Sequence, residues 1–325
     1  MYSALRPLLF KIKDPETAHN LSMQMMKSNN PVLRKAFPGL KPEAMRQAQS
    51  ANMSRQHAIG LAAGFDKDAK ALEFLSHLGF GAIEVGTVTL KPQIGNDRPR
   101  IWRMTEDESL RNAMGFPSGG VEEVIPRVKA YKGKATLGIN IGKNKDTPLE
   151  DAAAEYLELY NLLAQYGDYV VINVSSPNTK DLRQLQERSW LVQLLEPFTN
   201  IKDRKPLYLK ISPDESDEAT NDIVDVAKEF GLSGLIATNT TSDHNFDKGG
   251  VSGKLLTTKA HGVWRKLLKH ADDSFDVIAV GGLSAPEHFE EYFDLGGKFA
   301  QVYTGFVYQG PDILKLPRSC HLKAR

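Results

Sequence analysis

Short apolar segments recur along the chain, separated by segments in which apolar residues have a helical spacing. Eight of the apolar segments are apolar at nearly every position, which is typical of strands buried on both faces of a sheet. They predict a parallel sheet that is covered on both sides. The predicted strands are Ile59–Ala63, Ala82–Gly86, Thr136–Ile141, Tyr169–Val174, Leu207–Ile211, Gly234–Thr238, Val277–Gly281 and Ala300–Tyr303.

Four of the intervening segments carry apolar residues at positions i, i+3, i+4 and i+7, which lie on one face of a helix. Eight buried strands alternating with helices predict an α/β fold, the closed (β/α)8 or TIM barrel. An open doubly wound sheet is the alternative, but it would normally have a Gly-x-Gly-x-x-Gly loop after its first strand, and that loop is absent. The helical faces are Ala71/Phe74/Leu75/Leu78, Tyr156/Leu159/Tyr160/Leu163, Ile223/Val226/Ala227/Phe230 and Ala260/Val263/Trp264/Leu267.

The residues before the first strand predict a small helical extension, so we divide the chain into an extension at 1–50 and a barrel at 51–325. Asp14-Pro15-Glu16 is a helix start, with a capping residue, a proline at the first position and an acid in the first turn. The extension could be simple packing or an apolar opening for a lipid-like substrate, and composition alone favours packing. The expected apolar faces are Tyr2/Leu5/Leu9/Ile12 and Ala18/Leu21/Met25/Met26.

The end of the chain predicts a stunted closing helix. Gly310-Pro311-Asp312 is a helix start, with Ile313, Leu314 and Leu316 as its apolar side. Pro317 follows after little more than a turn and would interrupt the helix. Residues 318–325 contain one large apolar side chain, so we expect Cys320 to be exposed or poorly ordered and to have no catalytic part.

Composition and charge narrow the class of protein. Hydrophobic residues make up 41% and charged residues 25%, as in an ordinary globular protein, and the net charge of +1 gives no general reason to expect a nucleic-acid partner. The single cysteine excludes an internal disulfide and a thiolate metal site. No apolar stretch is long enough to span a membrane, and Met1–Lys13 lacks the features of a signal peptide.

In a barrel of this kind the catalytic groups lie at the carboxyl ends of the strands. The polar residues there are mainly amides, hydroxyls and lysines, which argues against the paired carboxylates of glycosidases and the ligand clusters of metal hydrolases. Asn and Thr side chains suit a planar polar ring, and glycines after the seventh and eighth strands suit a phosphate. This combination predicts a mononucleotide cofactor such as FMN and no metal. The residues include Lys67, Thr87, Asn140, Lys143, Asn173, Ser176, Asn178, Lys210, Thr238, Asn239, Thr240 and Thr304.

Ten ordered motifs make the chain resemble the class 2, quinone-linked dihydroorotate dehydrogenases from about residue 1 to about residue 313. Class 1 members use a cysteine as the base, whereas Cys320 lies outside every motif, so class 2 follows. The motifs are Gly60–Lys67, Glu84–Thr89, Gly95–Arg100, Asn112–Phe116, Gly138–Asn144, Asn173–Thr179, Ala237–Thr241, Gly249–Gly253, Val280–Gly282 and Gln301–Phe306.

The resemblance implies oxidation of dihydroorotate to orotate in de novo pyrimidine biosynthesis, with FMN as hydride acceptor and a membrane quinone as final electron acceptor. It implies that Ser176 removes a proton from the substrate carbon, with Thr179 and a water relaying that proton. It also implies that the N-terminal helices form the mouth of a quinone tunnel and rest on a membrane, peripherally on the cytoplasmic face of the inner (cell) membrane.

The resemblance assigns three further sets of residues. The expected substrate ligands are Lys67, Asn112, Phe116, Asn173, Asn178, Asn239 and Thr240. The expected FMN ligands are Ala63, Gly64, Lys67, Thr87, Asn140, Asn173, Lys210, Thr238, Gly253, Gly282, Tyr303 and Thr304. The expected quinone-site residues are His19, Arg103 and Tyr303. One departure from the family pattern stands at Pro117, where an amide residue is usual, and it puts substrate contacts of that loop in question.

Two other functions fit parts of the pattern. A Schiff-base aldolase on the same barrel would use Lys210 as its nucleophile and would be colourless. A non-catalytic barrel that only binds a nucleotide would not show substrate-dependent bleaching of a flavin.

Overall fold

The computed structural model describes residues 2–41, 48–49, 54–55 and 57–315. Eight parallel strands close into a barrel in the order β10-β12-β13-β3-β4-β7-β8-β9. All eight predicted strands are present, with ends that differ by up to two residues, so the closed barrel is confirmed and the open sheet is wrong. The strands are β3 (Ile59–Leu61), β4 (Ala82–Val88), β7 (Thr136–Ile141), β8 (Tyr169–Asn173), β9 (Leu207–Ile211), β10 (Gly234–Ala237), β12 (Asp276–Val280) and β13 (Ala300–Val302).

Large side chains fill the inside of the barrel. Tyr169 and Tyr208 are fully buried and meet edge to face, with ring centroids 5.6 Å apart. Gly138 gives Tyr169 its space, since a Cβ at Gly138 would stand 2.2 Å from the tyrosine ring. The inside of the barrel is therefore a packed core and not an open channel.

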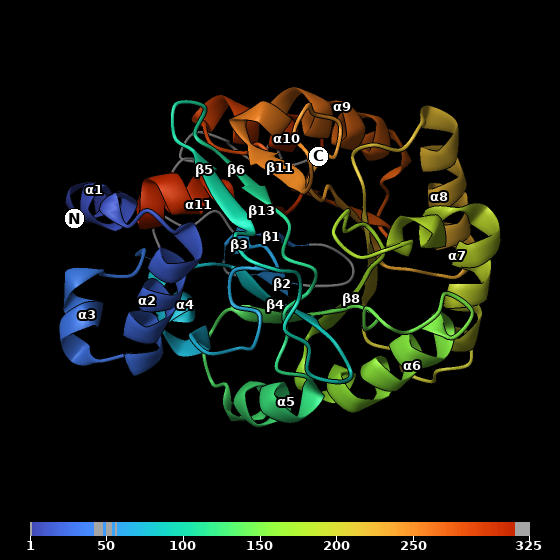
Figure 1. Cartoon of the computed structure of the whole chain (residues 1–325). Helices are drawn as coiled ribbons and strands as arrows, with labels where there is room; N and C mark the ends of the chain where they lie inside the picture. Colours follow the sequence, from blue (N-terminus) through green and yellow to red (C-terminus); the bar gives the residue numbers. More distant parts are fainter. Residues whose placement is uncertain (1, 42–47, 50–53, 56, 316–325) are drawn as a thin grey trace.

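Helices surround the strands, as Figure 1 shows. The four predicted helical faces lie on α4, α6, α8 and α9, and their apolar residues pack against the barrel. α8, for example, buries Ile223, Val226 and Ala227. The helices are α4 (Leu72–Leu78), α5 (Val121–Ala130), α6 (Ala152–Leu163), α7 (Arg188–Leu195), α8 (Asp217–Glu229), α9 (Thr257–Leu267), α10 (Pro286–Asp294) and α11 (Thr304–Gln309).

A separate antiparallel sheet of three strands, which the sequence did not predict, lies across the barrel in Figure 1. It consists of β5 (Ile101–Met104), β6 (Ser109–Asn112) and β11 (Gly250–Gly253), in the order β11-β6-β5. Every residue of β5 is only half-buried. Such short strands lack both a long apolar run and a clean alternation, so neither pattern reveals them. A shorter pair, β1 (Ala48–Gln49) and β2 (Ser54–Arg55), is also antiparallel.

In the described residues, three helices precede the barrel: α1 (Tyr2–Lys11), α2 (Pro15–Ser28) and α3 (Pro31–Ala36). They gather on one side of the molecule in Figure 1. Asp14 caps α2 through its carboxylate, as expected from the sequence. The expected face of α2 is partly wrong, because Leu21 and Met25 are 44% and 42% exposed while Met23 is buried. Among the described residues, no helix is long and apolar enough to cross a membrane.

A buried ion pair ties α2 to the segment before β5. The Glu16 carboxylate accepts hydrogen bonds from Arg100 Nη2 at 2.7 Å and Nε at 3.0 Å, and from Arg98 Nη2 at 3.0 Å. The side chains of Glu16 and Arg100 are only 6% and 8% exposed. Arg100 Nη1 also donates to the carbonyl of Asn96 at 2.9 Å, and Asn96 Nδ2 donates to the carbonyl of Asn178 at 3.1 Å. A continuous set of contacts thus runs from α2 to the loop after β8.

The expected helix start at Gly310 is present as the start of a 3-10 helix, and it follows a short helix, α11, that the sequence did not predict. α11 begins at Thr304, directly after β13, and a 3-10 helix at Gly310–Lys315 continues it. Gly310 ends α11 because its φ of 62° is a conformation that glycine tolerates. Ile313 and Leu314 are fully buried and cover this part of the barrel wall. The expectations for Leu316, Pro317 and Cys320 concern residues outside the described ones.

Candidate active site

A deep cavity opens at the carboxyl ends of the barrel strands, with the β5-β6-β11 sheet as part of its wall. Including the mouth that opens to solvent, it measures about 1290 Å³. Most residues expected to bind substrate or cofactor lie on it. They are Ala63, Gly64, Lys67, Thr87, Asn112, Phe116, Asn173, Ser176, Asn178, Lys210, Thr238, Asn239, Thr240, Gly253, Gly282, Tyr303 and Thr304.

Two expected residues, Asn140 and Thr179, are buried behind the cavity wall. Asn140 Oδ1 accepts hydrogen bonds from Thr87 Oγ1 at 2.7 Å and Asn173 Nδ2 at 3.2 Å, so it positions two residues that do face the cavity. Thr179 Oγ1 is buried without a hydrogen-bond partner. Pro117 is also not among the lining residues, whereas Phe116 is.

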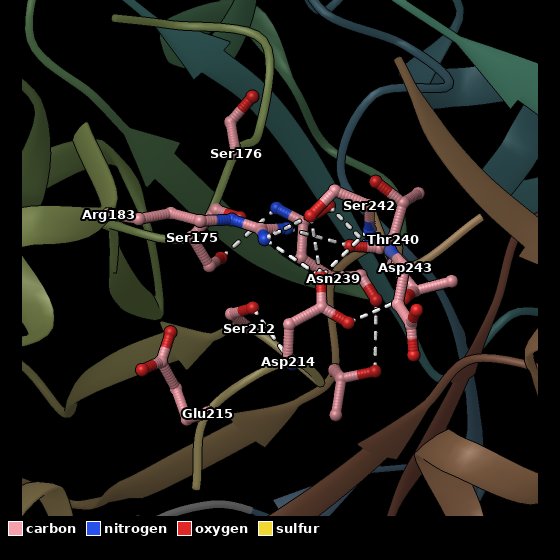
Figure 2. A network of polar contacts seen from close by, with 12 residues as sticks. Ser175, Ser176, Arg183, Ser212, Asp214, Glu215, Asn239, Thr240, Ser242 and Asp243 are labelled. Carbon is pink, nitrogen blue, oxygen red and sulfur yellow. Dashed lines mark hydrogen bonds and ion pairs between the residues drawn. The ribbon is translucent and has the colours of Figure 1, made fainter. Parts of the chain in front are cut away.

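Ser175 and Ser176 follow β8 and point in different directions, as Figure 2 shows. Ser176 lines the cavity and is 6% exposed, and its Oγ accepts a hydrogen bond from the backbone N–H of Asn178 at 3.2 Å. Ser175 Oγ instead donates to Asn173 Oδ1 at 3.1 Å and accepts from Asn239 Nδ2 at 3.0 Å. The expectation that these neighbours face opposite sides is confirmed. Ser176 keeps its own proton free for exchange with a ligand.

Amide side chains form another part of the cavity wall. Asn178 Nδ2 donates to Asn112 Oδ1 at 3.1 Å, and Asn239 Oδ1 accepts from the backbone N–H of Thr240 at 2.8 Å. Thr240 Oγ1 is buried and has no hydrogen-bond partner. A buried hydroxyl of this kind normally has one, so the wall fits a ligand with several polar edges.

Lys67 supplies positive charge to the cavity. Its Nζ donates to the carbonyl of Gly64 at 2.8 Å. Burial lowers the pKa of Lys67 to about 8, although the carboxylates of Asp68 and Glu16 raise it. Lys67 is therefore a cation at neutral pH and can bind a carboxylate.

Lys210 and Gln301 line the floor of the cavity, and Glu84 is buried behind them. Lys210 Nζ lies 3.8 Å from Glu84 Oε1, and both side chains are buried. Burial lowers the pKa of Lys210, while the charge of Glu84 raises it. Gln301 Nε2 donates to Glu84 Oε2 at 2.6 Å, and its Oε1 is buried without a partner although Gln301 lines the cavity. Sequence reasoning missed the roles of Glu84 and Gln301, because each is one polar residue between apolar neighbours in a short, mostly apolar strand.

Two glycines form a backbone cradle at the other end of the cavity. A Cβ at Gly282 would lie 2.4 Å from Thr257 Cα, and one at Gly253 would lie 2.6 Å from the carbonyl oxygen of Glu108. Both have positive φ, at 72° and 86°. Beside them, the hydroxyls of Ser252 and Thr304 are 2.8 Å apart. Backbone N–H groups and hydroxyls in this position suit a phosphate.

A second cavity, largely apolar, lies among α1, α2, α3 and the barrel. His19, Arg103 and Tyr303 all line it, and Tyr303 lines the first cavity as well. Burial lowers the pKa of His19 to about 3, so its ring is neutral. Arg103 Nη1 donates to the carbonyls of Phe10 and Ile12 at 3.0 Å, and Arg103 Nη2 is buried without a partner. The three residues expected around a quinone are thus brought together.

Comparison with known proteins points to one family. The family model described as dihydroorotate dehydrogenase matches residues 45–316. A relative named dihydroorotate dehydrogenase (quinone) from Marinomonas sp. (strain MWYL1) is 40% identical over 97% of this chain and 95% of its own length. The protein of the same name from Christiangramia forsetii is 41% identical over 97% of each. The ligand-free crystal structure of DHODH from Eimeria tenella is 33% identical and superposes with a TM-score of 0.84 over 94% of this chain and 93% of that one.

Proposed function

This chain belongs to the dihydroorotate dehydrogenase family, as an oxidoreductase of the quinone-linked type, and we propose that FMN accepts the hydride from dihydroorotate and a membrane quinone accepts the electrons. The observation that carries the proposal is the pair of cavities that share Tyr303 as a wall. One is lined by amides, hydroxyls and lysines at the strand ends, and the other is mainly apolar and lies among the N-terminal helices. A polar substrate and an apolar electron acceptor would thus reach opposite sides of one cofactor.

The residues of the first cavity fit FMN. The Gly253 and Gly282 cradle would hold its phosphate, and Lys210 would stand beside the pyrimidine end of the ring, where a cation stabilises a reduced, anionic flavin. The unpartnered Oε1 of Gln301 offers an acceptor on the same floor. FMN, when bound, supplies hydride acceptance. The remaining proposed ligands are Ala63, Gly64, Lys67, Thr87, Asn140, Asn173, Thr238, Tyr303 and Thr304.

The proton step falls to Ser176. Lys67 would bind the dihydroorotate carboxylate, while Asn112, Phe116, Asn173, Asn178, Asn239 and Thr240 would hold the ring. Ser176 Oγ would take the proton from one ring carbon as the hydride leaves its neighbour. A serine is a weak base on its own. Thr179, whose buried hydroxyl is unpartnered, would pass the proton on through a water.

The N-terminal helices would serve the quinone. We assign residues 1–50 to the quinone tunnel and membrane contact, and 51–325 to catalysis. Leu8 on α1 is 59% exposed, and Lys11 and Lys13 are exposed and available to anionic lipid, whereas Arg6 Nη1 donates to the carbonyl of Tyr308 at 2.9 Å. This arrangement supports a peripheral position on the cytoplasmic face of the inner membrane.

The visible spectrum tests the proposed function. The purified protein is expected to be yellow and to bleach when dihydroorotate is added without oxygen, with orotate as the product. A short-chain quinone should then restore the colour. A colourless protein would contradict the proposal that FMN is bound. It would favour the Schiff-base aldolase, in which Lys210 is the nucleophile. A yellow protein that does not bleach would be a flavin binder without this activity.

Orotate binding should depend on the charge of Lys67. Because the pKa of Lys67 is lowered to about 8, the side chain is protonated below that pH and neutral above it. The Kd for orotate should be nearly constant below neutral pH and rise about tenfold per unit well above the pKa. Titration of the flavin spectrum with orotate measures this. In Lys67→Arg the charge persists, so a rise of equal steepness in that variant would show that another group is responsible.

A further inference from the structure

Arg183 stands at the centre of a polar network beside the site, shown in Figure 2. It belongs to the 3-10 helix Leu182–Gln186, in the loop after β8. Its Nε donates to the carbonyl of Ser175 at 3.1 Å and its Nη2 donates to the carbonyl of Thr240 at 2.9 Å. Its Nη1 donates to Asp214 Oδ2 at 2.8 Å. One side chain thus contacts the loops after β8, β9 and β10.

Asp214 receives donors from several segments. Besides Arg183, its carboxylate accepts from Thr241 Oγ1 at 2.5 Å, from the backbone N–H of Ser242 at 2.7 Å and from Lys259 Nζ at 2.8 Å. Burial raises the pKa of the Asp214 carboxyl, but these hydrogen bonds outweigh burial and hold the pKa well below its usual value. Asp214 is therefore an anion at any working pH and fixes the guanidinium from one side.

A second contact holds the same loop in place. Gln186 Oε1 accepts from the backbone N–H of Ser212 at 2.9 Å, and its Nε2 donates to Glu215 Oε1 at 2.9 Å. The loop after β8 is thus fixed to the loop after β9 at two positions. Of these, only Arg183 also reaches the loop after β10.

The two carbonyls that Arg183 binds are next to the proposed chemistry. Ser175 precedes Ser176 in the chain, and Thr240 follows Asn239. The guanidinium therefore sets the distance between the segment that carries the base and the segment that holds the substrate ring. A lysine could not do this, because the contacts need donors in a planar fork.

We propose that Arg183, held by Asp214, is a positioning residue that aligns Ser176 with the amide wall at Asn239 and Thr240. The inference rests on the proposed function, since it gives the alignment a role in proton transfer. Misplacing a catalytic group by about 1 Å costs on the order of 10²-fold in rate. If Arg183 served stability alone, replacing it would lower the unfolding temperature without selectively slowing flavin reduction.

Arg183→Met should slow flavin bleaching by dihydroorotate by about 10–100-fold and weaken orotate binding. FMN content and the reoxidation of reduced flavin by a short-chain quinone should stay at wild-type levels. Asp214→Asn should have a smaller effect in the same direction. Arg188→Met is the matched control, because Arg188 lies on the same segment but makes only exposed ion pairs, at 3.6 and 3.7 Å.

Chemical rescue separates alignment from stability. Guanidinium added to Arg183→Gly should restore part of the bleaching rate, whereas sodium chloride at the same ionic strength should not, and Arg183→Lys should stay slow. Bleaching of Arg183→Met at wild-type speed would overturn the proposal. So would a parallel fall in FMN content, reoxidation rate and unfolding temperature.

Hydrogen–deuterium exchange tests, without relying on activity, whether Arg183 holds the loops after β8 and β10 together. In Arg183→Met, residues 175–187 and 239–243 should both exchange faster than in the wild type, while the other barrel strands should not change. Wild-type protection in both segments would overturn the proposal. If the wild-type protein fails to bleach with dihydroorotate, the proposed function falls, and this exchange experiment still decides whether Arg183 holds the two loops together.

Discussion

Replacing Ser176 by alanine is expected to slow the reduction of the bound flavin by dihydroorotate by about 10²–10⁴-fold, the usual contribution of a positioned proton acceptor. The hydroxyl of Ser176 faces the cavity, whereas Ser175 is not among the lining residues and Thr179 is buried behind the wall. FMN should remain bound, because the proposed FMN cradle does not include Ser176. Stopped-flow measurement of flavin bleaching under anaerobic conditions gives the rate.

Two measurements accompany this variant. Ser175→Ala should reduce the rate less, since the Ser175 hydroxyl supports Asn239 and does not face the substrate. The orotate-induced change in the flavin spectrum should persist in Ser176→Ala, which would show that the ligand still binds. If Ser176→Ala bleached near the wild-type rate, Ser176 would not be the base.

Filling the second cavity is expected to block electron transfer to a long-tailed quinone without affecting flavin reduction. Ala18 lines this cavity and is 8% exposed, so Ala18→Phe would place a ring in the space proposed for the quinone. A quinone would then have to enter space that the ring occupies, and forcing extra carbon into filled space costs a free energy of about 1–3 kcal/mol. Reoxidation should therefore fall by about one to two powers of ten.

The two half-reactions have to be followed separately. Leu21→Phe is the matched control, because Leu21 lies on the same helix but is 44% exposed and does not line the cavity. In Leu21→Phe, the long-tailed quinone should reoxidise the reduced flavin at the wild-type rate. If Ala18→Phe slowed flavin reduction as much as reoxidation, the cavity would be structural and the quinone would enter elsewhere. Substitution is preferred to deletion of the extension, since deletion would also remove the buried partner of Arg100.

The sequence predicted the barrel well because strands buried on both faces leave a local signal. Each of the eight appears as a short apolar run, and residues such as Ile59 and Leu207 are fully buried in the structure. The β5-β6-β11 sheet left no such signal, because its strands are only four residues long and β11 is far from β5 and β6 in the chain. The face of α2 was misplaced at Leu21 because helical spacing alone does not say which of two adjacent stripes meets the barrel.

The site was predictable where motifs fall at strand ends, and much less so where contacts cross between loops. Ser176, Lys67 and Asn239 follow barrel strands and line the cavity as expected. Arg183 and Asp214 are 31 residues apart in sequence, and a charged residue in a loop usually lies at the surface. Only the fold shows that they meet beside Ser175.

The contact of Glu16 with Arg100 determines which segments must be exchanged together in a chimaera of two related proteins. No residue of α1 is fully buried, although its Phe10 carbonyl accepts a hydrogen bond from Arg103 and its Arg6 donates one to the carbonyl of Tyr308. α2 is different, because its Glu16 holds the arginine that binds the Asn96 carbonyl, and Asn96 in turn binds the Asn178 carbonyl. A chimaera that imports a foreign α2 should therefore import residues 94–100 with it.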